Sequence, residues 1–166
     1  MSYLSRGLIK MGKEKFGLKG KVKIRIFKAK TGEVIEEEFD NLVVNAGKAE
    51  VAKLIGSGLG GTAFGYIAIG TGTTAEAATD TAMEVELKRK AATVTSVTSN
   101  ITNDTARFEA TFSSDDGLTG TSAVTEYGLF NDPTAGTMLS RVVQSAKNLD
   151  WDAGDSLTVT WDIIVS

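Results

Sequence analysis

Apolar and polar residues alternate along several stretches of this chain, and a period of two is typical of strands that bury one face. Residues 21–26 show it most clearly, because Lys and Arg alternate there with Val and Ile. A Thr31-Gly32 turn leads into residues 33–39, which carry four glutamates. We therefore expect a hairpin whose basic side chains face glutamates, at roughly 0.2–1 kcal/mol for each pair.

An apolar run over residues 63–74 ends in a Gly/Thr turn and predicts a buried central strand. Five further strands are expected at residues 92–98, 106–112, 122–130, 137–144 and 157–165. With about eight strands at regular spacing, the pattern predicts a mainly β fold, a sandwich or jelly-roll-like pair of sheets. The expected core includes Tyr66, Ile67, Ile69, Phe108, Phe112, Leu129, Val159 and Trp161, and Ala110 also points inward.

Two short helices complete the expected fold. The first runs from Asn45 as N-cap to Gly56 as the residue after its C-terminus, and Val51, Leu54 and Ile55 form its apolar face.

The second helix is expected over residues 82–90, capped by Asp80 or Thr81. Thr81 and Glu84 have the spacing of a capping box, and residues 88–90 place positive charge at the C-terminal end.

Composition narrows the possible chemistry. The 166 residues include no Cys and no His, so disulfides, thiolate metal sites and the commonest general base are absent. No run of 18 apolar residues is present, and the first 16 residues hold no continuous apolar core of a secretory signal. We expect one β-rich domain over residues 21–166.

Charge is strongly polarised along the chain. The first 30 residues carry ten basic and one acidic side chain, a net charge of +9, and the remainder carries −12. Such asymmetry indicates a partner for the basic end: nucleic acid, an anionic membrane, or an acidic protein surface, including that of a neighbouring copy.

Residues 1–20 contain four glycines among scattered apolar residues, which disfavours a helix and predicts an extended basic arm. A terminus that is merely basic and disordered is the alternative. If the arm binds a partner, its interface residues are Leu4, Arg6, Leu8, Ile9, Lys10, Lys13, Lys15, Phe16 and Lys19.

Other clusters of chemical interest are expected to be structural. Residues 56–61 match G-x-G-x-x-G, but the motif follows a helix and precedes a strand, the reverse of a dinucleotide site. The acidic run at residues 36–38 cannot converge on one ion, because consecutive strand residues point to opposite faces. The acids Glu76, Asp80, Glu84, Glu86, Asp104, Asp115 and Asp116 form no clear carboxylate or Ca²⁺ site. We predict no catalytic, cofactor-binding or metal-binding residue, and no enzymatic activity.

Four segments carry a resemblance: NLVVNAG at residues 41–47, YIAIGTGTT at 66–74, TEYGLFN at 125–131 and LTVTW at 157–161. Together they resemble a family of tailed-bacteriophage structural proteins, including small virion proteins and the start of some tail-fibre or tail-collar proteins. The resemblance covers roughly residues 41–166 and excludes the basic start of the chain. Its motifs are structural and bring no catalytic residue with them.

The resemblance implies a virion component, assembled in the host cytoplasm. One expectation is a capsid decoration (cement) protein that binds the outside of the head as a homo-oligomer, with a trimer favoured, while its arm contacts the major capsid protein or an adjacent copy. The alternative is a tail, baseplate or tail-fibre adaptor. The chain ends at Ser166 with no shaft or tip, which disfavours a full-length fibre. Nucleic acid and membrane partners are not expected, and a carboxylate-based glycan hydrolase is disfavoured because no acid sits in a Trp-lined apolar context.

Overall fold

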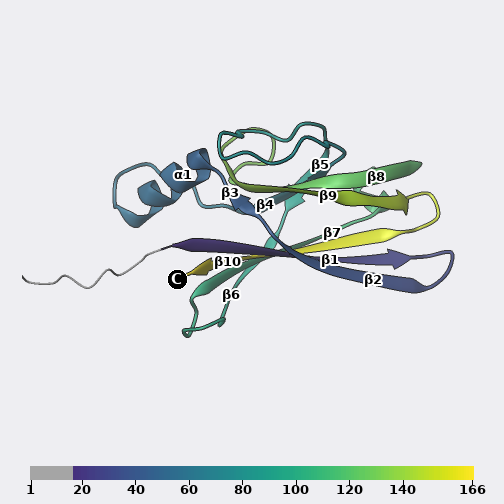
Figure 1. Cartoon of the computed structure of the whole chain (residues 1–166), viewed down its shortest axis with the longest axis horizontal. Coiled ribbons are helices and arrows are strands. Elements are labelled where there is room, and N and C mark those ends of the chain that lie inside the picture. Colours follow the sequence, from purple (N-terminus) through teal and green to yellow (C-terminus); the bar gives the residue numbers. More distant parts are fainter. Residues whose placement is uncertain (1–16) are drawn as a thin grey trace, which may run out of the picture.

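The computed structural model describes residues 17–166, so residues 1–16 of the predicted arm, with all its interface residues except Lys19, lie outside the described residues. The arm is predicted to extend to residue 20, but residues 18–20 already belong to the first strand. The fold is mainly β, with two antiparallel five-stranded sheets packed as a sandwich (Figure 1). The first sheet has the order β2 (Glu33–Asp40), β1 (Leu18–Lys28), β10 (Ser156–Val165), β7 (Thr105–Phe112) and β6 (Thr93–Val97). The second has the order β3 (Leu42–Val43), β9 (Met138–Asp150), β8 (Thr121–Phe130), β4 (Tyr66–Gly70) and β5 (Glu86–Ala91). The predicted sandwich is confirmed.

The N-terminal hairpin forms as predicted. β1 and β2 pair antiparallel, with Lys23 opposite Glu38 and Arg25 opposite Glu36. Diagonal ion pairs join Lys21 to Glu38 at 2.6 Å and Lys23 to Glu36 at 2.9 Å on the exposed face. β1 begins at Leu18, three residues before the predicted strand, and Lys19 is exposed on it.

The chain crosses between the sheets on both lateral sides of the sandwich. On one side β2, an edge of the first sheet, continues through Asn41 into β3, an edge of the second. On the other side β5 continues through Ala92 into β6. Each connection joins an edge of one sheet to the facing edge of the other.

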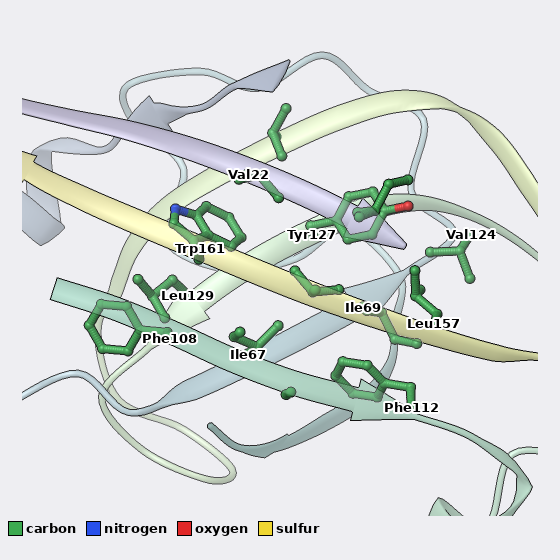
Figure 2. Close-up of a cluster of buried hydrophobic side chains, with 14 of the residues drawn as sticks. Val22, Ile67, Ile69, Phe108, Phe112, Val124, Tyr127, Leu129, Leu157 and Trp161 are labelled. Carbon is green, nitrogen blue, oxygen red and sulfur yellow. The ribbon is translucent and has the colours of Figure 1, made fainter. Parts of the chain in front are cut away.

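The core lies between the sheets (Figure 2). Seven of the eight predicted core residues are buried there; the exception, Tyr66, is half-buried on the opposite face of the second sheet. The alternation in β7 is confirmed, since Phe108, Ala110 and Phe112 all point inward. β4 lies between β8 and β5, so the apolar run forms an interior strand as predicted.

The first predicted helix is confirmed as α1 (Asn45–Ile55), but its details differ. Val44 occupies the N-cap position without a side-chain cap, and Gly56 has an extended φ of −99°, so neither Asn45 nor Gly56 has its predicted role. The two buried residues of α1 are Gly47 and Glu50. Of the predicted apolar face, Val51 is half-buried and packs against the core, whereas Leu54 and Ile55 are exposed. Gly47 permits the close approach of α1 to β9, because a Cβ there would overlap the backbone of Leu139 in β9.

The second predicted helix does not form, and the described residues include a single α-helix. Residues 86–91 are instead β5, which pairs antiparallel with β4. Residues 82–90 are mostly good helix formers, but pairing with a buried strand overrides this intrinsic preference, which is worth only tenths of a kcal/mol per residue. Thr81 and Glu84 make no capping box; the Glu84 carboxylate accepts hydrogen bonds from the backbone of Thr73 and Thr74.

Candidate partner-binding groove

Many of the acidic residues noted in the sequence form hydrogen bonds or ion pairs within the described residues. The loop between β4 and β5 is held by Glu126, which is fully buried. Its carboxylate accepts backbone hydrogen bonds from Gly72, Glu84 and Val85. Arg141 donates to Glu126 and to Asp80, each at 2.8 Å. This buried network, together with the Glu84 contacts, fixes the loop between β4 and β5 against β8 and β9.

Sequence reasoning missed Glu126 and Arg141. Glu126 is the one charged residue in the stretch from Val124 to Phe130, which is otherwise apolar except for Thr125, and a charged residue in such a strand is a signal of a buried ion pair. Its partner could not be inferred, because Arg141 lies on β9 and the pairing depends on the register of β8 against β9.

Several of the other acids also have structural partners. The Asp104 carboxylate accepts backbone hydrogen bonds from Ser99, Asn100 and Ile101, each at 2.8 Å. These hydrogen bonds, that from Ile101 first, hold the pKa of Asp104 well below its usual range. The consecutive glutamates point to opposite faces as predicted: Glu37 pairs with Lys147 of β9 at 2.7 Å, whereas Glu36 and Glu38 face the basic residues of β1.

Within residues 17–166, no group of three or more His, Cys, Asp or Glu side chains is placed to hold a metal ion. No helix in this part of the chain is long and apolar enough to cross a membrane. The glycine motif forms the loop after α1, where Gly58 has a positive φ of 80°.

The basic residues at the start of the described chain are largely paired within the domain. Besides the pairs of Lys21 and Lys23, Arg25 lies 3.6 Å from Glu36, and Lys30 lies 2.6 Å from Asp150. Lys28 pairs with the buried carboxylate of Asp155. The basic surplus predicted for a partner is therefore partly neutralised inside this domain.

The surface feature with the clearest binding character is an apolar groove of about 430 Å³ at one end of the sandwich. We call it the end groove and define it by the apolar residues in its lining: Leu18, Val51, Leu54, Ala63, Phe64, Val94, Ala106, Phe108, Leu139, Ile163 and Val165. Val94 pairs with Phe108 across β6 and β7, and Val165 follows Ile163 on β10, so these side chains belong to the inward faces of the strands. The end groove is thus the core itself, opened to solvent between the sheets.

Helix α1 and the groove share an exposed apolar rim. Val94 is 50% exposed, Val165 42%, Leu54 43% and Ile55 72%. The helix leaves this side uncovered because Gly47 and Glu50 make its contact with the sheet. Glu50 is fixed there: its carboxylate accepts from the backbone N–H of Thr62 at 2.7 Å and pairs with Lys53 at 2.9 Å. The backbone hydrogen bond from Thr62 and then the Lys53 ammonium lower the pKa of Glu50.

A second hollow of about 300 Å³ continues the groove along α1, and Leu18 and Val51 line both. It is also lined by Gly17, the first described residue. The N-terminal segment therefore enters the domain at the wall of this apolar surface. Figure 1 shows α1, the start of β1 and the C-terminus gathered at this end, with the β1–β2 hairpin at the other.

Comparison with known proteins found no matching protein-family model, no matching curated protein and no matching solved structure.

Proposed function

We propose that this protein is a non-enzymatic structural component of a tailed-bacteriophage virion. Its favoured role is a capsid decoration protein that binds the outside of the head through its domain and N-terminal arm. The observation that carries a binding role is the end groove, an exposed apolar surface on a domain whose other notable polar clusters are internally paired. Exposed apolar surface of this kind is characteristic of protein interaction sites.

The four segments that carry the bacteriophage resemblance contact one another in the structure, which supports reading them as a structural signature. In TEYGLFN, Thr125 donates its hydroxyl to the Gly72 carbonyl of YIAIGTGTT at 2.7 Å, and Glu126 accepts from the Gly72 amide at 3.2 Å. NLVVNAG supplies β3 and the start of α1 in the same region. LTVTW lies in β10 of the facing sheet and supplies Trp161 to the core.

A non-enzymatic role is supported by the electrostatics of the described acids. Every carboxyl group with a clear shift has its pKa lowered, as at Glu84, where the backbone N–H of Thr74 and its hydroxyl stabilise the anion. A general acid that works near neutral pH needs a raised pKa instead. Hydrolysis of peptidoglycan or capsule polysaccharide, abolished by one Asp or Glu substitution, would contradict this part of the proposal.

Copy number in the virion distinguishes the two structural roles. The expected result, from cryo-electron microscopy or from gel quantitation against the major capsid protein, is hundreds of copies on the head. A handful of copies at the tail would support the adaptor role and overturn the decoration role.

The arm's contribution is tested by deleting residues 2–16, which keeps β1 whole because that strand begins at Leu18. We expect a folded domain that no longer binds particles. Replacing Lys10, Lys13, Lys15 and Lys19 with Gln should slow binding most at low salt, since exposed charges are screened beyond about 8 Å at physiological ionic strength. Lys23→Gln, on the exposed face of the first sheet, is the control. A deletion variant that binds as well as the full chain would remove the arm from the proposal.

A further inference from the structure

We propose that the end groove binds the N-terminal arm of a second copy of this chain, so that neighbouring copies are joined arm into groove. The inference rests on the proposed structural function and names the partner that the groove accepts. Three features of the chain support this binding: the position of the groove, the composition of residues 1–16 and the direction of the backbone at Gly17.

The end groove has the chemistry of a peptide-binding groove. Its lining is predominantly apolar, from strands of both sheets, from α1 and from the segment before β4. An extended or helical segment with spaced apolar side chains is the usual occupant of such a groove. The exposed rim residues Leu54, Val94 and Val165 would each lose water contact when a segment binds.

Residues 1–16 have the matching chemistry. They carry apolar residues at positions 4, 8, 9, 11 and 16. They also carry four basic residues and one acidic residue, a net charge of +3, whereas residues 17–166 carry −6. A second copy therefore offers the arm both an apolar groove and a body of opposite net charge, which favours encounter between copies.

The chain path at Gly17 favours a second copy over the same copy. The Gly17 amide donates to the Ser166 carbonyl at 2.6 Å, and the Ser166 amide donates back at 3.0 Å. These bonds extend the pairing of β1 and β10 to Gly17, so the backbone at Gly17 continues the direction of β1. An arm in its own groove would have to reverse immediately before Gly17. A neighbour's groove requires no reversal, and 16 extended residues reach about 50 Å.

Gly17, to which the arm is joined, and the groove lie at the same end of the domain, so each copy can give its arm and receive another. A reciprocal exchange between two copies closes into a symmetric dimer, whereas passing the arm from copy to copy gives a ring when the rotation between copies closes and an open filament when it does not.

The absence of cysteine makes a direct test possible, because any disulfide must join introduced residues. A Leu8→Cys copy is mixed with a Leu54→Cys copy, oxidised, and digested for peptide mapping. We expect disulfides that join position 8 of one copy to position 54 of the other. The control replaces Leu54→Cys by Thr31→Cys, which lies in the exposed hairpin turn at the opposite end of the sandwich and should cross-link far less.

A doubly substituted Leu8→Cys, Leu54→Cys chain separates the two geometries. Equal amounts of isotope-labelled and unlabelled chains are mixed before oxidation, and labelled-to-unlabelled disulfides report exchange between copies. If all disulfides stay within one chain even at high protein concentration, the arm occupies its own groove and the proposal is overturned. Cross-linking no more frequent than with Thr31→Cys also overturns it.

Light scattering on the uncross-linked protein supplies the second measurement. We expect the full chain to self-associate, deletion of residues 2–16 to give monomers, and Leu54→Gln to weaken association by about tenfold or more. Val34→Gln is the matched control, because Val34 is 44% exposed against 43% for Leu54 but lies on β2, outside the groove. Equal association of the two variants contradicts the proposal. The two proposals can fail separately. If the cross-links show arm exchange but the virion holds only a few copies, only the decoration role is overturned. If the virion holds many copies but the cross-links show no exchange, only this inference is overturned.

Discussion

The two ends of the sandwich differ in how they are closed. At the hairpin end, the buried carboxylate of Asp155 accepts hydrogen bonds from the Ala29 and Asp150 backbones, each at 2.9 Å, and pairs with Lys28. Trp151 is fully buried beside it and donates its indole N–H to Ser122 at 2.9 Å. At the groove end, Asp104 orders the loop before β7, but the inward-facing side chains between the sheets remain partly exposed.

The difference indicates which groups serve the domain and which are left for a partner. Polar and aromatic groups at the hairpin end satisfy one another, so that end is complete within one chain. Apolar side chains at the groove end stay in contact with water, at a cost of roughly 25 cal/mol per Å² of apolar surface. An apolar segment from outside the described domain would recover that free energy.

The largest expected effect compares two phenylalanines on the same strand. Figure 2 shows both side chains on β7 within the core. Phe112 is fully buried, whereas Phe108 is 5% exposed and lines the end groove. Phe112→Ala should destabilise the domain by about 4 kcal/mol, and Phe108→Ala by about 3 kcal/mol, because a site next to the groove can relax more easily. Urea denaturation measures both. Midpoints within error of the unsubstituted protein would refute the alternation in β7, and a larger loss at Phe108 would refute the contrast between the ends.

The second largest loss of stability should come from removing the Asp155 carboxylate at the hairpin end. Asp155→Ala removes the acceptor of two backbone N–H groups and the ion-pair partner of Lys28, which keeps only its hydrogen bond to the Asn148 carbonyl; we expect a cost of about 2–3 kcal/mol. Asp152→Ala, at an exposed position in the same turn, should change stability by less than about 0.5 kcal/mol. Chemical denaturation of the two variants measures the difference. Equal stabilities would mean that Asp155 does not close this end.

At the groove end, Asp104 should give a pH dependence. Its folded-state pKa is lowered, so its contribution to stability is present above the unfolded pKa of about 3.9 and is lost as pH falls toward the folded value. The difference in Tm between the unsubstituted protein and Asp104→Asn should therefore shrink from pH 7 to about pH 3. Asp115→Asn, at an exposed position in a short 3₁₀ turn, is the control. A difference that stays constant with pH would contradict this role for Asp104.

The smallest effect should come from the groove rim. Leu54→Ala is expected to reduce the stability of the isolated domain by less than about 1 kcal/mol, because the side chain is already nearly half exposed. The fully buried Leu129→Ala should cost about 2–5 kcal/mol. The loss of stability in the two variants is compared by thermal denaturation, with residues 2–16 deleted from both so that the arm does not contribute. Equal losses would show that Leu54 belongs to the core of one domain rather than to a binding surface.

Prediction from sequence was accurate where the signal is local and periodic. The alternation in residues 21–26 and 106–112 predicted both the strands and their inward faces, because a side chain's face follows directly from its parity in a strand. Prediction failed at residues 82–90, where capping spacing and charge order suggested a helix but pairing with β4 made a strand. It also misjudged α1: the apolar face was identified, yet the glycine at position 47 allowed another face to pack on β9.

By itself, the sequence determined the class of fold, most of its strands, seven of eight named core residues and the charge pairing of the first hairpin. Each of these depends on relations between residues that are only two to about twenty positions apart in the sequence. Only the tertiary structure decided that Glu126 meets Arg141, that the basic residues of β1 are neutralised within the domain, and that one end of the core stays open beside Gly17. These features depend on which strands become neighbours and in what register. That information is distributed over the whole chain and does not reside in any one segment.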